Sequence, residues 1–264
     1  MTDGDPARAD RVHFSPRLEA LRGLAALMVA CFHVTQAPWK HEQALVGAGY
    51  YPNAFWEACS KLLFVLCNGL GAVNLFFVLS GFVLAGSLAR GPAAAGAAAR
   101  RFLAARVCRL YPAVWAAVAA YALLFSLVPA GLALNPGEIT PLRVGLNMLL
   151  LDRSLNGVMW SLQLEMLAVP LILLGALLSR SWGAAPLVAL TAVLIALSFT
   201  GRWTQGFGNV GLDPLFCFTL GMLLRHGRDV FERVPPGQLA LLGALGLMLF
   251  FLPRALLGRS TGDF

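Results

Sequence analysis

The stretch from Arg17 to Val34, RLEALRGLAALMVACFHV, is apolar enough to enter a membrane, yet beyond the arginine that opens it, it carries three residues that could do chemistry. They are Glu19, Arg22 and His33. Charged and titratable side chains are costly in hydrocarbon, so within a membrane helix they usually mark a functional site. An imidazole can take a proton from a hydroxyl near neutral pH, and a guanidinium binds anionic groups. The stretch therefore predicts a polar site on a membrane helix.

Helical geometry places these three side chains in one stripe. Arg22 and His33 are eleven residues apart, which brings them to within about 20° of the same face and separates them by ~16 Å along the axis. Glu19 lies close enough to Arg22 to pair with it and within about 40° of His33. The alternative is that Glu19 and Arg22 are an interfacial pair and that His33 bonds to a neighbouring helix.

A further carboxylate lies in the segment NGVMWSLQLEMLAVP, residues 156–170. Glu165 is inside the apolar run, one helical turn after Ser161, and Trp160 precedes both. A carboxylate at this depth is expected to take a cation or a histidine as its partner. The alternative is an interfacial glutamate that reaches water. Trp160 and Ser161 are candidate substrate-binding or structural residues.

The segment NLFFVLSGFVLAGSL, residues 74–88, combines small residues with one amide. Ser80, Gly81 and Gly86 would let a neighbouring helix approach closely. Asn74 is a polar group that requires a partner in an apolar setting. We treat Asn74 and Ser80 as substrate-binding or structural residues.

The segment RRFLAARVCRLYPAVWA, residues 100–116, is rich in arginine. If it is helical, Arg101, Arg106 and Arg109 gather within about 140° of arc, and the planar fork of arginine suits phosphate groups. The alternative is a topological anchor beside the membrane. Pro112 is expected in the first turn of a span. The overlapping Ala/Gly stretch ARGPAAAGAAARRF, residues 89–102, predicts a flexible cytoplasmic loop.

The composition predicts an all-α, polytopic transmembrane helix bundle. Of the 264 residues, 58% are hydrophobic and only 12% are charged, with a mean hydropathy of +0.73, values far from those of a soluble domain. Residues 1–16 form an expected cytoplasmic tail, 17–257 a single transmembrane domain and 258–264 a second tail. Segment 142–151 is too short to cross alone, and is either an interfacial or re-entrant helix or the lower end of a longer span reaching Trp160. The length of the chain allows about seven to eight spans. The apolar runs place seven of them near residues 18–37, 69–88, 111–131, 161–179, 184–201, 210–225 and 238–257.

The net charge of +7 is explained by membrane topology. With a cytoplasmic amino terminus, twelve lysines and arginines fall on the cytoplasmic side and seven on the other, as the positive-inside rule requires. Nucleic acid is therefore not an expected partner. No cysteines stand at metal-ligand spacing, so no metal is expected. Cys59 and Cys67 either form a disulfide or remain two thiols.

Four motifs in this order resemble those of the integral-membrane acyltransferase-3 family: RLEALRGLAALMVACFH, NLFFVLSGF, RRFLAARVCRLYP and WSLQLE. They extend from residue 17 to residue 165. Members of this family move acyl groups from acyl-CoA to hydroxyls on extracytoplasmic glycans and other acceptors. They usually have about ten spans of about 20 residues each, so this chain is expected to be a short form, a fragment or a shortened product.

The resemblance implies roles for the candidate residues. Arg22 would help the three clustered arginines, Arg101, Arg106 and Arg109, to hold the CoA phosphates, and His33 would act as general base. Glu165 would orient the imidazole or stabilise its charged form. A covalent acyl-histidine is the alternative route. Glu19 and Asn74 stand where the family more often has aspartate, so a role for Asn74 is not implied.

The expected function is therefore an O-acyltransferase of a bacterial-type plasma (inner) membrane, multi-pass and surrounded by membrane lipid. The expected donor is acyl-CoA, acetyl-CoA by preference, and the expected acceptor is a glycan or a lipid-linked sugar. One alternative is a transporter-like bundle whose stripe conducts a proton or binds a solute. Such bundles commonly contain symmetric repeats, and none is visible here. The other alternative is an inactive, truncated family member.

Overall fold

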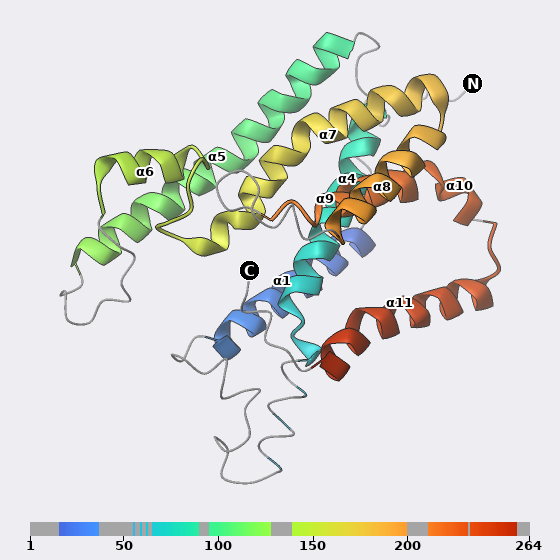
Figure 1. The fold of residues 1–264 in the computed structure, drawn as a ribbon, viewed down its shortest axis with the longest axis horizontal. Helices are drawn as coiled ribbons and strands as arrows, with labels where there is room; N and C mark the ends of the chain where they lie inside the picture. Colours follow the sequence, from blue (N-terminus) through green and yellow to red (C-terminus); the bar gives the residue numbers. More distant parts are fainter. Residues whose placement is uncertain are drawn as a thin grey trace, which may run out of the picture. The chain divides into compact units, whose positions relative to one another are not determined.

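A computed structural model describes residues 16–36, 65–89, 95–127, 139–199, 211–231 and 233–257, with Phe55, Cys59 and Leu62. All regular secondary structure in these residues is helical, and no strand occurs among them (Figure 1). The all-α membrane bundle predicted from composition is confirmed. The chain divides into two compact units, residues 1–79 with 242–263 and residues 80–241, and each is described by itself.

A helix occupies each of the seven segments expected to span the membrane. In the described part of the chain, three segments are long and apolar enough to cross a bilayer: Gly69–Ala89, Gly96–Leu127 and Gly157–Trp182. Two further apolar helices, Ala185–Ser198 and Leu215–His226, are shorter. The seven helices are α1 (Pro16–Gln36), α4 (Gly69–Ala89), α5 (Ala95–Leu127), α7 (Trp160–Trp182), α8 (Ala185–Ser198), α9 (Leu215–His226) and α11 (Pro236–Leu257), and the short elements are α6 (Pro141–Met148), η3 (Gly157–Met159) and α10 (Arg228–Phe231).

Helix α5 corrects two of the predictions. Its Ala/Gly stretch is helical from Ala95 onward rather than a flexible loop, because alanine is the strongest helix former. Pro112 therefore lies inside a 33-residue helix and not in a first turn. Proline removes one backbone donor from the helix, a loss that membrane helices tolerate where neighbouring groups satisfy the freed carbonyl.

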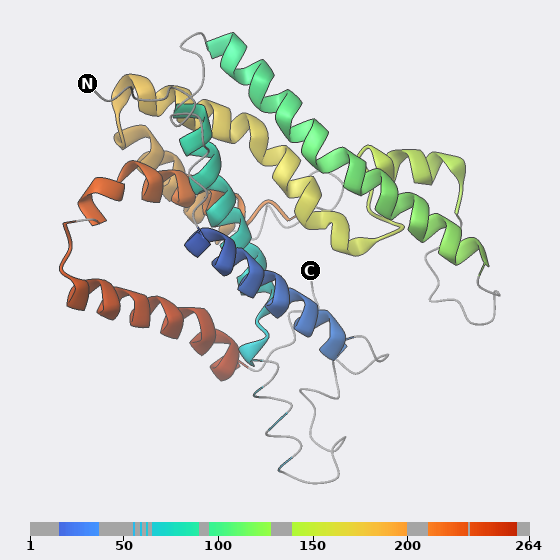
Figure 2. The same ribbon diagram turned by 180° about the vertical axis from the view of Figure 1, so that it is seen from behind.

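The core of residues 80–241 is built by α7, α8 and α9, which pack against one another (Figure 2). Helix α5 runs along α7, and α6 packs on α5. Ile172 from α7, Leu187 from α8 and Phe218 from α9 are fully or almost fully buried. These three helices therefore form the scaffold on which the polar residues of this unit are placed.

Helix α4 approaches α9 at two glycines, as the small residues of this segment predict. A Cβ atom at Gly81 would lie far closer to the Phe218 carbonyl oxygen than van der Waals contact allows. At Gly86 a Cβ would lie 3.2 Å from Nε of Arg225. Glycine at these two positions lets α4 lie against the α9 backbone and against an α9 side chain.

The segment around α6 is a compact hairpin rather than the end of a longer span. Thr140 caps α6, its Oγ1 accepting a hydrogen bond from the backbone N–H of Arg143 at 3.3 Å. Leu150, just after the helix, has φ +57°, the left-handed conformation usually taken by glycine. A leucine occupies this position because its side chain is buried against the apolar side chains of Val114, Val118, Leu155 and Met159.

A polar network closes the turn that follows. The buried side chain of Asn147 donates to the carbonyl oxygen of Arg143 at 2.9 Å and to Asp152 Oδ2 at 3.3 Å. Asp152 also accepts from Ser154 Oγ and from the backbone N–H groups of Arg153, at 2.7 Å, and Ser154, at 3.1 Å. Burial acts to raise the pKa of Asp152, but these hydrogen bonds and the charge of Arg143 outweigh it and lower the pKa below its usual value.

This lowered pKa predicts how the stability of the turn depends on pH. A carboxyl group with a depressed folded-state pKa contributes stability above its unfolded pKa, about 3.9, and loses it as the pH falls through the folded value. We expect Asp152→Asn to lower the unfolding midpoint at pH 7 by roughly 2–4 °C, and the difference from wild type to shrink below about pH 4. Thermal unfolding of both proteins in detergent at pH 7 and pH 3 measures this. An equal difference at both pH values contradicts it.

Candidate functional site

A largely buried ion pair in residues 80–241 joins α5 to α7. Nη2 of Arg106 lies 2.5 Å from Oε1 of Glu165, and the two side chains are 5% and 17% exposed. Ser80 on α4 donates its Oγ hydrogen to the same oxygen at 3.2 Å. Three helices thus meet at one carboxylate oxygen. Of the two partners foreseen for Glu165, a cation or a histidine, the contact seen in the described chain is with a cation.

The periodicity of α5 explains why Arg106 points inward. The buried residues of this helix are separated by four residues or, across Leu110, by eight, a spacing that keeps them on one face. Arg106 falls on this face, whereas Arg101 and Arg109 are exposed. The structure therefore separates the three arginines that the sequence groups together. The buried series is Ala98, Phe102, Arg106, Val114 and Val118.

A buried ion pair of this kind contributes little net free energy to folding, and its stability depends on the hydrogen bonds around it. Removing two charges from water is expensive, and their attraction offsets that cost only where further hydrogen bonds complete the site. Ser80 supplies such a hydrogen bond to Glu165. Loss of one partner would leave the other charge buried and uncompensated. The contact thus fixes the register of α4, α5 and α7.

Helix α1 carries Glu19, Arg22 and His33, the three residues of the predicted polar stripe. Nη1 of Arg22 lies 3.0 Å from Oε1 of Glu19, which confirms the predicted pairing of these residues. His33 is exposed in the last turn of the helix, with its ring centroid 5.7 Å from that of Phe32 in an edge-to-face arrangement. Phe32 in turn packs on Gly69, where a Cβ would lie 2.5 Å from Cδ1 of the ring. The start of α4 therefore fixes the residue next to His33.

This contact predicts the effect of Gly69→Ala. The added methyl group meets Cβ, Cγ and Cδ1 of Phe32, and side-chain rotation cannot move the Cβ atom away. We expect a loss of about 1–3 kcal/mol in the free energy of unfolding. Gly23→Ala in α1 is the control, because a Cβ there meets nothing within 4 Å and should be neutral or slightly stabilising. Denaturant unfolding in detergent compares them, and equal stabilities would contradict the packing.

The remaining candidates lie at helix starts or in α4. Trp160 and Ser161 are the first residues of α7, and Ser161 Oγ donates to the carbonyl oxygen of Val158 at 3.5 Å. Asn74 lies within α4, and its buried Oδ1 has no hydrogen-bond partner among the described residues. Ser161 thus makes a local contact at the start of α7. Within the described residues, no donor satisfies the Oδ1 atom of Asn74.

Comparison with known proteins supplies the family. The acyltransferase-3 family model, described as an acyltransferase domain, matches residues 15–261. The chain belongs to the acyltransferase-3 family. The match takes in all of the described helices and every motif that carries the resemblance in the sequence. No curated protein and no solved structure matches the chain significantly.

Two features of this acyltransferase-3 protein were not predicted from its sequence. One is the pairing of Arg106 with Glu165, because the span predicted for this part of the chain begins at residue 111, too late to place Arg106 on a buried helical face. The other is a small basic cavity lined by Arg180, Arg225 and His226. The only local sign of it is that these residues stand in the last turns of α7 and α9.

In the described part of this acyltransferase-3 protein, no group of three or more His, Cys, Asp or Glu side chains gathers that could hold a metal ion. Cys59 and Cys67, both described, are not joined by a disulfide, which leaves the thiol alternative.

Proposed function

We propose that the protein transfers an acyl group, acetyl by preference, from cytoplasmic acyl-CoA to a hydroxyl of an extracytoplasmic glycan or lipid-linked sugar. The observation that supports this most strongly is the family match over residues 15–261. We further propose that the chain lies in a bacterial-type plasma membrane with its amino terminus in the cytoplasm. The excess of arginine on that side of the proposed topology supports this orientation.

We propose His33 as the general base. Its imidazole would take the proton of the acceptor hydroxyl as that oxygen attacks the thioester carbonyl. Collapse of the tetrahedral intermediate would then break the carbon–sulfur bond and release CoA as a thiolate, which takes up the proton. The exposure of His33 at the end of α1 supports this role, because a general base must reach the acceptor.

Exposed arginines are the proposed ligands of the donor phosphates. Arg101 and Arg109 are exposed on α5, and Arg22 is partly exposed on α1. Arg106 contacts Glu165, so a phosphate contact would require this ion pair to open. Glu165, held by two donors, is proposed to orient His33 or to stabilise its charged form.

The test of this proposal is His33→Ala. Removal of a general base should lower turnover by about 10²–10⁴-fold without changing the yield of folded protein. Membranes are incubated with radiolabelled acetyl-CoA, and labelled glycans are separated from labelled lipids. Purified protein is assayed in parallel for thioester consumption.

The matched control is Leu27→Ala, which alters an exposed residue of the same helix and should turn over as wild type does. Wild-type turnover in the His33 variant would overturn the role of His33. Absence of protein-dependent thioester consumption in the wild type would overturn acyl transfer from CoA.

A further inference from the structure

The hydroxyl of Ser80 donates to another helix rather than to its own. Its Oγ lies 3.2 Å from Oε1 of Glu165 on α7. Serine and threonine hydroxyls inside a helix commonly bond back to a carbonyl of the preceding turn. Several hydroxyls in the helices of residues 80–241 do so, namely those of Ser126, Ser179, Thr191 and Thr219. The contact made by Ser80 therefore differs from the usual behaviour of a helical hydroxyl in this protein.

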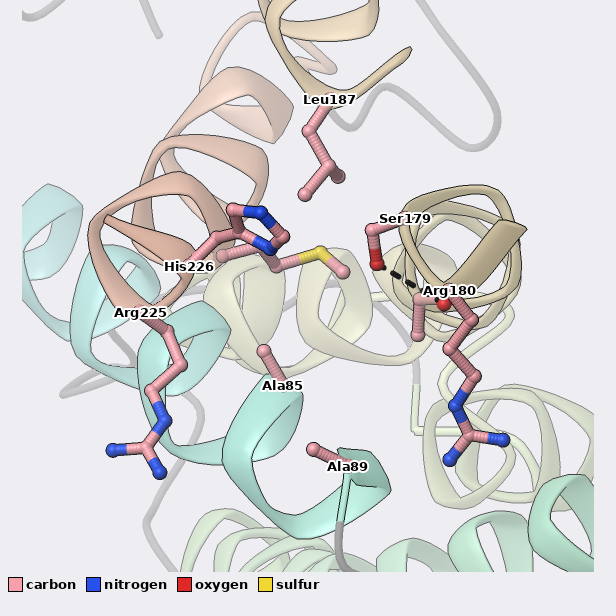
Figure 3. A pocket seen from close by; sticks show the side chains of 9 residues that line it. Ala85, Ala89, Ser179, Arg180, Leu187, Arg225 and His226 are labelled. Atoms are coloured by element: carbon pink, nitrogen blue, oxygen red, sulfur yellow. Dashed lines mark hydrogen bonds between the residues drawn. The ribbon is translucent and has the colours of Figure 1, made fainter. Parts of the chain in front are cut away.

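The end of α4 is held in place without this hydrogen bond. Arg180 from α7 and Arg225 from α9 lie on opposite sides of it, and their guanidinium groups point away from each other (Figure 3). Nη2 of Arg180 donates to the carbonyl oxygen of Leu88. Cζ of Arg225 lies 5.4 Å from the ring centroid of Phe82, a cation–π distance. These two contacts should keep α4 in position when the hydroxyl of Ser80 is removed.

Packing alone would accept an alanine in place of Ser80. The next residue, Gly81, lies against the carbonyl oxygen of Phe218 on α9, and close approaches of this kind need small residues. Alanine is small and has no polar group to bury, whereas a hydroxyl in an apolar setting costs free energy unless it is hydrogen-bonded. The hydroxyl is thus explained by its acceptor, Glu165, and not by the fit of α4.

The two donors to Glu165 leave one of its oxygens available. Nη2 of Arg106 and Oγ of Ser80 both contact Oε1, and in the described part of the chain no donor contacts Oε2. The side chain is 17% exposed, so the carboxylate is not sealed in the core. The last torsion of a glutamate has only broad preferences, and one donor leaves the carboxylate able to turn. A second donor from a different helix fixes the direction of Oε2.

We propose that Ser80 is a positioning residue for acyl transfer, an assignment that rests on the proposed function. Its hydroxyl holds the carboxylate of Glu165 so that Oε2 faces the group on which Glu165 acts. Ser80 touches neither substrate, and no bond to it forms or breaks in the reaction. Its effect on turnover comes from the orientation of Glu165, since small displacements of a functional group lower the rate of reaction strongly.

The test compares Ser80→Ala with Ser80→Thr in the full chain. Membranes that contain each variant are incubated with radiolabelled acetyl-CoA over a range of concentrations, and the label transferred per folded protein gives kcat and KM. Ser80→Ala should lower kcat by about tenfold or more, because a hydrogen bond to a charged group is lost. The KM for acetyl-CoA should not change, because Ser80 does not contact the donor. Ser80→Thr keeps the hydroxyl and should restore most of the turnover.

The matched control is Ser126→Ala. It removes a hydroxyl that donates to the carbonyl oxygen of Leu123 in its own helix, at 2.8 Å, and should turn over as wild type does. Denaturant unfolding of each variant in detergent measures any loss of packing. A purely structural role would lower the stability of Ser80→Ala and leave the kcat of its folded fraction unchanged, and that result would overturn the proposal. A kcat as low in folded Ser80→Thr as in folded Ser80→Ala would also overturn it, because the loss would not follow the hydroxyl.

The failure of this assignment and the failure of the proposed function give different results. A folded wild type that transfers no label from acetyl-CoA overturns the proposed transfer from this donor, and the role of Ser80 with it. An active wild type whose kcat is matched by folded Ser80→Ala overturns the role of Ser80 alone. A lower kcat in Ser80→Ala, with rescue by Ser80→Thr and an unchanged Ser126→Ala, supports both.

Discussion

Glu165→Ala is expected to lower the free energy of unfolding by about 3–5 kcal/mol. The substitution leaves the guanidinium of Arg106, 5% exposed, as an uncompensated charge between α5 and α7. Total stabilities of domains are about 5–15 kcal/mol, so the expected loss is a large fraction of the free energy of unfolding. Denaturant unfolding in detergent, with size-exclusion profiles of the membrane extract, measures the loss.

Two controls define the cause of that loss. Arg101→Met removes an exposed charge from α5, the helix that carries Arg106, and should change stability by no more than about 0.5 kcal/mol. The double variant Arg106→Met/Glu165→Met removes both buried charges and should regain most of the lost stability. A single variant as stable as wild type would contradict the buried ion pair. A stable but inactive double variant would show that the pair also contributes to chemistry.

Gly81→Ala is expected to cost about 3 kcal/mol or more in the free energy of unfolding, at the upper end of the usual range for overpacking. The added methyl group would overlap the carbonyl oxygen of Phe218, and a backbone atom inside α9 cannot rotate away. The helices must separate, which disturbs the contact between Ser80 and Glu165 next to it.

Two other glycines calibrate this effect. Gly86→Ala meets only the side chain of Arg225, which can shift, so its cost should be small. Gly96→Ala in α5 meets nothing within 4 Å and should stabilise the protein by roughly 0.5–1 kcal/mol, since alanine is favoured over glycine in a helix. Thermal unfolding of the three variants should rank Gly81→Ala as the least stable. Equal midpoints would contradict the close approach of α4 and α9.

Features set by residues near one another in the chain could be predicted from the sequence. The apolar runs predicted the long helices, and the three-residue spacing of Glu19 and Arg22 predicted their ion pair, because helix geometry alone brings such residues together. The partner of Glu165 could be predicted only as a class. Its identity depends on where α5 begins: a helix from Ala95 puts Arg106 on the buried face, whereas a helix from about residue 111 leaves it in a loop.

The basic cavity could not be predicted from residues near one another in the chain. Its residues come from α4, α7, α8 and α9, which are separated by long stretches of chain. No periodicity within one helix indicates which ends of other helices will meet it. Its arginines are also typical of ordinary membrane anchors, so composition could not distinguish residues that line a cavity from a topological signal.

The contact between Arg106 and Glu165 also bears on how the chain enters the membrane. A charged residue at the centre of a membrane helix carries an insertion penalty of roughly 2.5–3.5 kcal/mol. Arg106 lies in the amino-terminal half of the 33-residue α5, where the penalty is smaller because the side chain can reach the interface. The two residues are 59 positions apart, so α5 is synthesised first and must enter without its partner, its arginine reaching toward water along its flexible stem. Helix α7 then emerges beside a cation already in place. The order of these helices along the chain thus gives the later carboxylate a counterion on arrival, and completes the bundle only when α7 has been made.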